Sequence, residues 1–145
     1  MATFTFFDAF KQRLGDGEID LTTGTGHVFK FVLSASTPNV DTFDDLADIT
    51  VISGTGGYAD YTITHSWAET GAGTGIYRFA NDEDVVWTAS GGAFDAFRYV
   101  YCYDDTHASD ALVGYFDNGS TVNLTDTNTF TVNLDANFEI FTLDG

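Results

Sequence analysis

Short segments in which apolar and polar residues alternate make up most of this chain. In the first of them, Phe29, Phe31 and Leu33 alternate with the residues between them. Similar segments follow at 49–53, 58–67, 76–80, 84–89, 94–103, 112–117, 121–124, 129–134 and 138–143. Such alternation is typical of β-strands, and stretches rich in glycine and aspartate separate the segments. The pattern predicts an all-β fold, an antiparallel β-sandwich with a jelly roll as the preferred form.

One short amphipathic helix is predicted before the first strand. Apolar residues recur there at spacings of three and four, at Phe6, Phe7, Phe10 and Leu14. Thr5 is the expected N-cap and Gly15 the expected C-terminal stop. No linker composition interrupts the chain, so we expect one domain over 1–145, opened by a helical segment at 1–15.

The segment Asp117-Asn118-Gly119-Ser120 predicts a hairpin turn between the strands at 112–117 and 121–124. Asn-Gly pairs tolerate the positive φ angles of a type I′ turn. A second region, 41–48, is expected to form either one helical turn or an acidic loop.

The charge balance excludes several classes of partner. Among 145 residues, 22 are acidic and 5 are basic, which gives a formal net charge of −17. Binding to nucleic acid or to an anionic membrane needs clustered lysine and arginine, so we expect neither partner. No transmembrane helix or secretion signal is predicted, and we expect synthesis in a cytoplasm. The hydrophobic content of 43% is sufficient for a folded core, in which Cys102 is expected to be buried.

The residues that could support catalysis do not form a recognisable motif. The strongest cluster is 104–110, where Asp104, His107 and Ser109 lie close in sequence. A carboxylate could orient an imidazole as a base there, but no nucleophile elbow accompanies it. A solvated loop is the favoured interpretation, so we predict no enzyme, no catalytic residues and no cofactor. His65 is in phase with apolar residues and is predicted to lie in a core or an interface.

Carboxylates are also the natural ligands of hard cations. They gather at 41–48 and at 104–110, but no EF-hand pattern is present. Asp82, Glu83 and Asp84 are consecutive, so they cannot all point into one cleft as a glycosidase pair would require. Diffuse charge that favours solubility is the preferred interpretation, and no metal site is predicted.

The strand predicted at 94–103 carries a row of aromatic residues. Phe97, Tyr99 and Tyr101 are expected on one face, with Arg98, which must snorkel or pair with an acid, on the other. Two interpretations remain open: the aromatic face is an interface with a partner, or the strand is central and covered on both sides. The N-terminal aromatic residues leave the same choice open. The candidate partner interface therefore consists of Phe4, Phe6, Phe7, Phe10, Phe97, Tyr99 and Tyr101.

Taken together, several segments resemble a family of small structural proteins of tailed phages. The matching segments occur in the same order over nearly the whole chain, at 10–20, 29–33, 84–87, 103–106, 112–117, 129–135 and 138–143. Among them are Asp84-Val-Val-Trp87 and Tyr103-Asp-Asp-Thr106. The chain departs from the family pattern at 54–80 and at 136–138.

The resemblance implies a virion component, a decoration or cement protein on the outer surface of the capsid. Such proteins are compact β-sandwiches, often trimeric, that clamp neighbouring subunits of the major capsid protein. The expected partners are therefore the major capsid protein and further copies of this chain. An alternative is a β-sandwich module of a tail, neck or fibre that binds another virion protein or host carbohydrate. In that case Trp67, Trp87 or exposed tyrosines would form a stacking platform.

Overall fold

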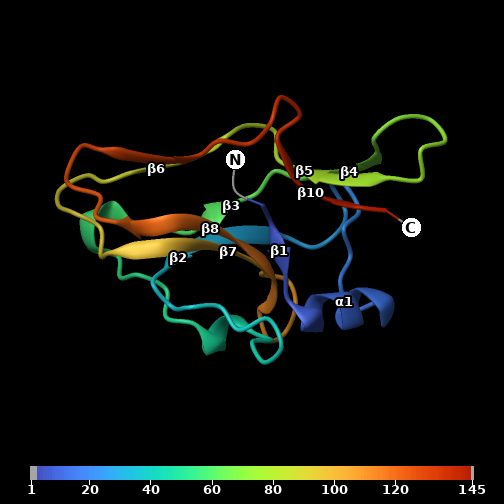
Figure 1. Cartoon of the computed structure of the whole chain (residues 1–145), viewed down its shortest axis with the longest axis horizontal. Coiled ribbons are helices and arrows are strands. Elements are labelled where there is room, and N and C mark those ends of the chain that lie inside the picture. The colour runs from blue at the N-terminus through green and yellow to red at the C-terminus, as the bar shows by residue number, and fades with distance from the viewer. Residues whose placement is uncertain (1–2, 145) are drawn as a thin grey trace.

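The computed structural model describes residues 3–144 and consists mainly of antiparallel strands in three sheets (Figure 1). The largest sheet has the order β1-β8-β7-β2-β3, with bounds Thr5–Phe6, Ala111–Val122, Phe97–Asp104, Phe29–Ser34 and Tyr61–Thr62. A three-stranded sheet has the order β10-β5-β4, with bounds Glu139–Leu143, Tyr77–Ala80 and Ser66–Glu69. The third sheet pairs β6 (Val85–Thr88) with β9 (Thr129–Val132). The all-β prediction is confirmed.

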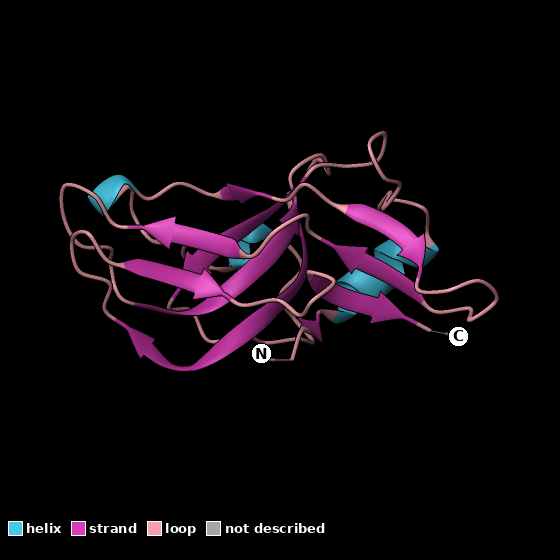
Figure 2. Cartoon of the chain, turned by 90° about the horizontal axis from the view of Figure 1, so that it is seen from above, coloured by secondary structure: helices cyan, strands magenta, loops and turns pink. Residues whose placement is uncertain are grey.

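The main hydrophobic core lies between the five-stranded sheet and the two smaller sheets. Phe29 of β2 meets Phe79 of β5 with ring centroids 5.1 Å apart, and Phe97 of β7 meets Phe130 of β9 at 4.9 Å. Figure 2 shows the two smaller sheets side by side along the long axis of the molecule. Both therefore cover the same face of the large sheet, and one apolar cluster joins all three.

A second core covers the opposite face of the five-stranded sheet. Tyr99, Tyr101 and Tyr103 of β7 pack there against Phe43 and Leu46. The covering segment, 35–51, lies below the sheet together with α1 in Figure 1. Of the two interpretations left open for this strand, the structure has the second: β7 is central and buried on both faces.

The alternation expected along β7 fails at its first residues. Phe97 faces the main core, whereas Tyr99 and Tyr101 face the second core. The pairing between β7 and β8 shifts register between Phe97 and Tyr99, which is a β-bulge. Between these pairs β8 advances from Asp117 to Val122 while β7 advances only from Phe97 to Tyr99, so the extra residues lie in β8. A bulge bends the pair and re-aims the side chains beside it. The prediction of one common face for Phe97 and the tyrosines was therefore wrong.

The N-terminal helix is shorter than predicted. Helix α1 spans Asp8–Gly15, and its N-cap is Phe7, which provides no side-chain hydrogen bond. Thr5 and Phe6 form β1 and pair with Tyr115 and Gly114 of β8. The expected cap at Thr5 was wrong because β8 offers this segment backbone partners that a sequence pattern does not reveal.

The hairpin predicted at 117–120 is also absent. Strand β8 runs without interruption through these residues from Ala111 to Val122. Gly119 has a φ of 85°, and its N–H donates to Oδ1 of Asp117 at 2.8 Å. The positive φ that favours a hairpin turn is used here in the bulge opposite β7. The remaining elements are two short 3-10 turns, η1 (Leu46–Asp48) and η2 (Thr55–Gly57), the first within the expected acidic region.

Candidate functional site

Most of the aromatic residues predicted to contact a partner lie inside the chain. Phe7, Phe10, Phe97 and Tyr101 are at most 1% exposed, and Tyr99 is 7% exposed. They are core residues in this structure, because segment 35–51 and the small sheets already cover them. Phe4 and Phe6 differ, since both remain half-buried.

Phe4 and Phe6 line a cleft of about 310 Å³ between β1 and β10. The Phe4 ring stacks on Phe141 with centroids 5.4 Å apart, and the Phe6 ring meets Phe141 edge to face at 4.9 Å. Glu139 and Thr142 form the polar side of the cleft. The two walls are the terminal strands of different sheets.

A second cleft, of about 230 Å³, lies between β8 and β9. Its lining is apolar at Val100, Phe116, Phe130 and Val132, and polar at Asp117, Asn118, Thr131 and Asn133. The Phe116 ring in this cleft contacts the Phe4 ring of the first cleft at 5.1 Å. We call the two adjoining clefts the seam, defined by Phe4, Phe6, Phe116, Phe130 and Phe141.

Arg98 and Asp117 form an ion pair at the rim of the seam. Arg98 donates through Nε and Nη2 to the two carboxylate oxygens of Asp117, at 2.8 and 3.0 Å. These hydrogen bonds hold the pKa of Asp117 below its ordinary value. The expectation that Arg98 must snorkel or pair with an acid is confirmed as a pair.

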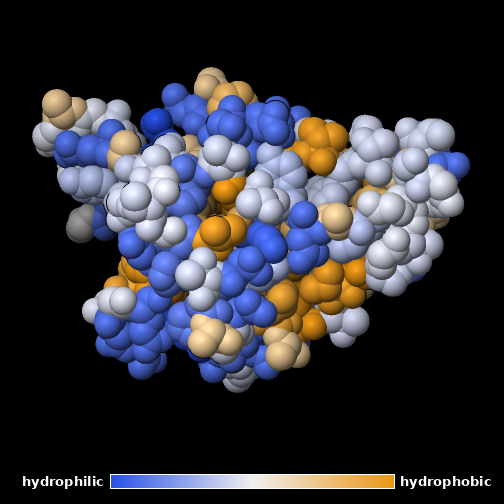
Figure 3. Space-filling model, turned by 180° about the vertical axis from the view of Figure 1, so that it is seen from behind, coloured by the Kyte–Doolittle hydropathy of each residue, from blue (hydrophilic) through white to orange (hydrophobic). Residues whose placement is uncertain are grey.

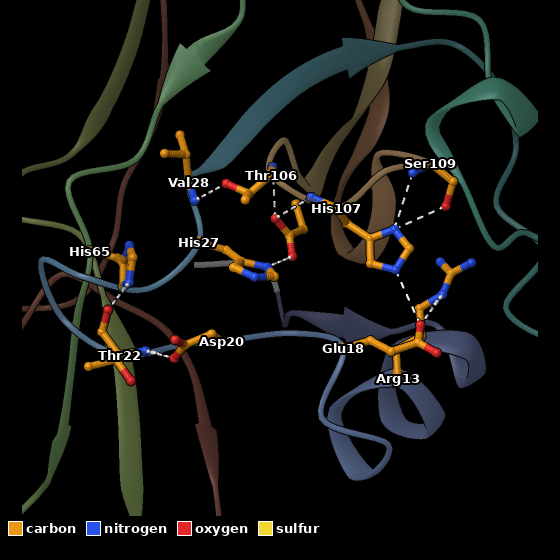
Figure 4. A network of polar contacts seen from close by, with 11 residues as sticks. Arg13, Glu18, Asp20, Thr22, His27, Val28, His65, Thr106, His107 and Ser109 are labelled. Atoms are coloured by element: carbon orange, nitrogen blue, oxygen red, sulfur yellow. Dashed lines mark hydrogen bonds and ion pairs between the residues drawn. The ribbon is translucent and has the colours of Figure 1, made fainter.

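The predicted loop at 104–110 takes part in a polar network near the start of β2 (Figure 4). Asp104 is fully buried, and its Oδ2 lies 2.5 Å from Nδ1 of His27. Its Oδ1 accepts from the N–H groups of Thr106 and His107, at 3.0 and 3.2 Å. The hydroxyl of Thr106 in turn accepts from the N–H of Val28. These bonds connect the end of β7 to the segment that enters β2.

His107, Ser109 and Glu18 come together, but not in an arrangement suited to general-base catalysis. Nε2 of His107 lies 3.2 Å from Glu18, and Nδ1 accepts from the backbone N–H of Ser109 at 3.2 Å. The hydroxyl of Ser109, 3.1 Å from Nδ1, donates to Asp45 at 2.8 Å. A general base needs a free lone pair directed at the proton of the nucleophile. Here the lone pair and the proton both have other partners, so the arrangement secures the loop.

The carboxylates of the acidic segments serve as acceptors for the chain itself. Oδ2 of Asp48 accepts from the N–H groups of Asp44 and Asp45. Oδ1 of Asp45 forms an ion pair with Nη2 of Arg13, at 2.9 Å. Within residues 3–144, no group of three or more His, Cys, Asp or Glu side chains is placed to hold a metal ion. Among the same residues, no helix has the length and apolar character needed to cross a membrane.

The two tryptophans have different environments. Trp87 is 5% exposed, and its Nε1 donates to the carbonyl of Ala59 at 3.0 Å. Trp67 is half-buried and stacks on Tyr77, with centroids 5.5 Å apart and an interplanar angle of 22°. Tyr77 is 42% exposed. Of the stacking residues considered from the sequence, Trp87 is therefore buried, whereas Trp67 and its exposed neighbour Tyr77 form a stacked pair that solvent reaches.

The structure also places His65 and Cys102. His65 is half-buried at the border of the core and stacks on Phe79, with ring centroids 4.9 Å apart. Cys102 is fully buried, and burial raises the pKa of its thiol well above the ordinary value. A buried thiol of this kind is inert.

Comparison with known proteins adds no relative. No protein-family model, curated protein or solved structure matches this chain. The seam is therefore the candidate functional site on its geometry alone. Of its five aromatic residues, the sequence had singled out Phe4 and Phe6, whereas Phe116, Phe130 and Phe141 look like ordinary strand residues. Nothing in the local sequence indicates that β9 and β10 lie at the edges of their sheets, apart from the lack of charged residues in 129–132.

Proposed function

We propose that this chain is a virion structural protein of the capsid decoration type. It binds the outer surface of the shell formed by the major capsid protein and stabilises that shell. The order of short motifs that resembles such proteins supports the proposal, and so does the antiparallel β architecture. In this proposal the sheets form a jelly-roll sandwich, and the chain acts as a homo-oligomer, with a trimer favoured.

The observation that carries the proposal is the seam. An adhesive protein needs a rigid body and a few apolar side chains that become buried when it docks. Phe4 and Phe6 are half-buried, and they sit on a fully packed aromatic cluster that fixes their positions. They therefore offer apolar surface to a partner at a small cost in side-chain entropy.

The surface charge fits a protein exposed on the outside of a particle. Figure 3 shows hydrophilic residues over much of one face, with separate hydrophobic patches between them. A net charge of −17 keeps particles apart and soluble through mutual repulsion.

The test is the copy number of the chain in purified virus particles. We expect hundreds of copies per particle, and a Thr142→Arg variant that obstructs the first cleft should lower this number about tenfold. Thr142 is half-buried and polar, so the variant leaves the aromatic cluster intact. Tyr77→Ala, an exposed change outside the seam, is the matched control and should retain full occupancy. A handful of copies, or full occupancy by Thr142→Arg with an unchanged melting temperature, would refute the proposal.

A second candidate function is a carbohydrate-binding module of a tail, neck or fibre. The observation that favours it is the stacked, partly exposed pair of Trp67 and Tyr77. Aromatic faces with a polar tip are suited to stacking against sugar rings. Binding of neutral oligosaccharides that quenches Trp67 fluorescence, is lost in Trp67→Ala and coincides with a handful of copies per particle would establish this function instead.

A further inference from the structure

Strand β9 is an edge strand without the usual protection. Among residues 3–144 it pairs with β6 alone, and its residues, Thr129-Phe-Thr-Val132, include no charge and no proline. Natural proteins protect exposed edges with lysine, proline, bulges or covering segments, because an open edge pairs with other chains. A two-stranded sheet is also only marginally stable, and a third strand strengthens it.

Backbone hydrogen bonds next to β9 fix which of its backbone groups point outward. The N–H of Ala89 donates to the carbonyl of Asn128, just beyond the β6 and β9 pairing. Hydrogen-bonded and non-bonded pairs alternate along an antiparallel ladder. Phe130 and Val132 therefore bond to β6, whereas the N–H and C=O groups of Thr129 and Thr131 point away from it. Thr131 lines the second cleft of the seam.

The opposite wall of that cleft also presents an open edge. The N–H of Phe7 donates to the carbonyl of Val113, so Val113 and Tyr115 are directed towards β1. Asp117 follows in the same set of outward residues, and β1 begins at Thr5, opposite Tyr115. Between the two walls, the floor is formed by Val100, Phe116, Phe130 and Val132. An extended segment placed there meets backbone groups at its side and apolar side chains beneath it.

We propose that the β9 edge accepts an extended segment of a partner protein as an added strand, with apolar side chains alternating with lysine or arginine. Apolar side chains of the segment enter the cleft, and the basic ones alternate with them on the outer face, where the net charge of −17 attracts a basic segment. A second copy of the chain is not the proposed occupant of this edge, because no segment of its sequence alternates apolar residues with two or more basic ones. Only the identity of the partner rests on the proposed function: if the chain binds the capsid, the added strand comes from the major capsid protein.

The test uses the whole chain and a blocked eight-residue peptide of alternating valine and lysine. Binding is measured by calorimetry, and backbone hydrogen exchange identifies the protected amides. We expect protection at Thr129 and Thr131, and we expect an otherwise identical peptide of valine and glutamate to bind at least about tenfold more weakly. Methylation of alternate peptide nitrogens should abolish binding, because it removes the donors of the new ladder.

Two proline variants test the edge directly. Thr131→Pro removes an N–H that points towards the cleft and should weaken binding about tenfold. Val86→Pro is the matched control, because the N–H of Val86 points outward from the opposite edge of the same sheet. It should change binding less than about twofold. If either variant fails to fold, two other measurements test the β9 edge. Thr131→Lys should weaken binding because it repels the basic peptide, and hydrogen exchange of the unmodified chain should show protection at β9.

Several results would overturn the inference. They are the absence of binding by the valine and lysine peptide, protection that lies elsewhere than β9, or equal binding of the acidic peptide. Dimerisation that Thr131→Pro abolishes would show that a second copy occupies the edge. Peptide binding at β9 by a chain that is absent from virus particles would refute the proposed function alone. Particle occupancy without strand addition at β9 would refute this inference alone.

Discussion

Asp104 shows how one buried side chain can organise two distant segments. It is 0% exposed, lies 2.5 Å from His27, and accepts two backbone N–H groups of the loop that follows it. A buried polar group without a hydrogen-bond partner destabilises the fold, so these bonds satisfy the N–H groups as well as the carboxylate. The sequence allowed one catalytic role for this residue, a carboxylate that orients an imidazole base, whereas its contacts join two segments of the fold.

Replacing Asp104 with alanine should therefore be strongly destabilising. The change leaves the N–H groups of Thr106 and His107 without their acceptor, which should lower the free energy of unfolding by about 2–4 kcal/mol. Urea unfolding measures the loss. Asp105→Ala is the matched control: its carboxylate is partly exposed and pairs with Lys30, so its loss should cost less than about 1 kcal/mol. Equal costs for the two variants would contradict the structural role.

Gly114 is required by close packing rather than by an unusual backbone angle. A Cβ at this position would overlap the ring of Phe4 and lie 2.5 Å from the carbonyl oxygen of Thr5. Gly114→Ala should displace β1 and lower the free energy of unfolding by about 1–3 kcal/mol. The cost should shrink in a Phe4→Ala background, which removes the clashing ring. Gly15→Ala, with open space around its Cβ, should not destabilise the chain. Additive effects of Gly114→Ala and Phe4→Ala would show that the two residues do not interact.

At the scale of elements, β7 depends on a segment that has no regular structure over most of its length. Segment 35–51 covers the tyrosine face of β7, and the hydroxyl of Tyr101 donates to the carbonyl of Ser36 at 2.5 Å. This bond anchors the cover at a point 65 residues away in sequence. The cover explains why a strand with so many aromatic residues is not an exposed surface.

Tyr101→Phe should loosen that cover while leaving the ring packing unchanged. We expect a loss of about 1 kcal/mol in the free energy of unfolding and faster hydrogen exchange within 35–51. Tyr99→Phe is the matched control, because the Tyr99 hydroxyl has no hydrogen-bond partner among the described residues. Faster exchange in both variants, or in neither, would show that the bond to Ser36 does not hold the segment.

Elements were predicted well where their pattern was local and poorly where another strand decided the outcome. The alternation at 29–33 and 112–117 identified β2 and the first part of β8. The Asn118-Gly119 pair was assigned to a hairpin, because a positive φ suits both a turn and a bulge. Only the pairing with β7 distinguishes the two. The same holds for Phe4 and Phe6, which lie at the seam because β10 runs beside β1 there.

At the scale of the whole molecule, buried tyrosines should make the fold sensitive to alkali. Burial is the main reason that the pKa values of Tyr58, Tyr101 and Tyr103 exceed their ordinary value of 10, and for Tyr103 the nearby Asp60 carboxylate adds to it. A raised pKa in the folded state gives stability that is fully present below pH 10 and is lost as the pH rises above it. Unfolding should therefore set in above pH 10, together with tyrosinate absorbance.

The control for this prediction is Tyr103→Phe. This variant removes one of the three buried hydroxyls that ionise on unfolding. The free energy of unfolding should therefore fall less steeply above pH 10, with a slope smaller than that of the unmodified chain by about 1.4 kcal/mol per pH unit. Ionisation of all tyrosines before any loss of circular dichroism would contradict the prediction.

The sequence by itself determined the class of the fold and the kinds of ligand that its charge disfavours. Strand alternation is a local property and net charge is a sum over residues, so neither depends on the tertiary contacts of the chain. The tertiary structure decided which aromatic residues remain at the surface, where β8 bulges, and how His107 and Ser109 share their hydrogen bonds. Those outcomes depend on contacts between residues far apart in sequence, and the free energy of each contact exists only once the sheets have assembled.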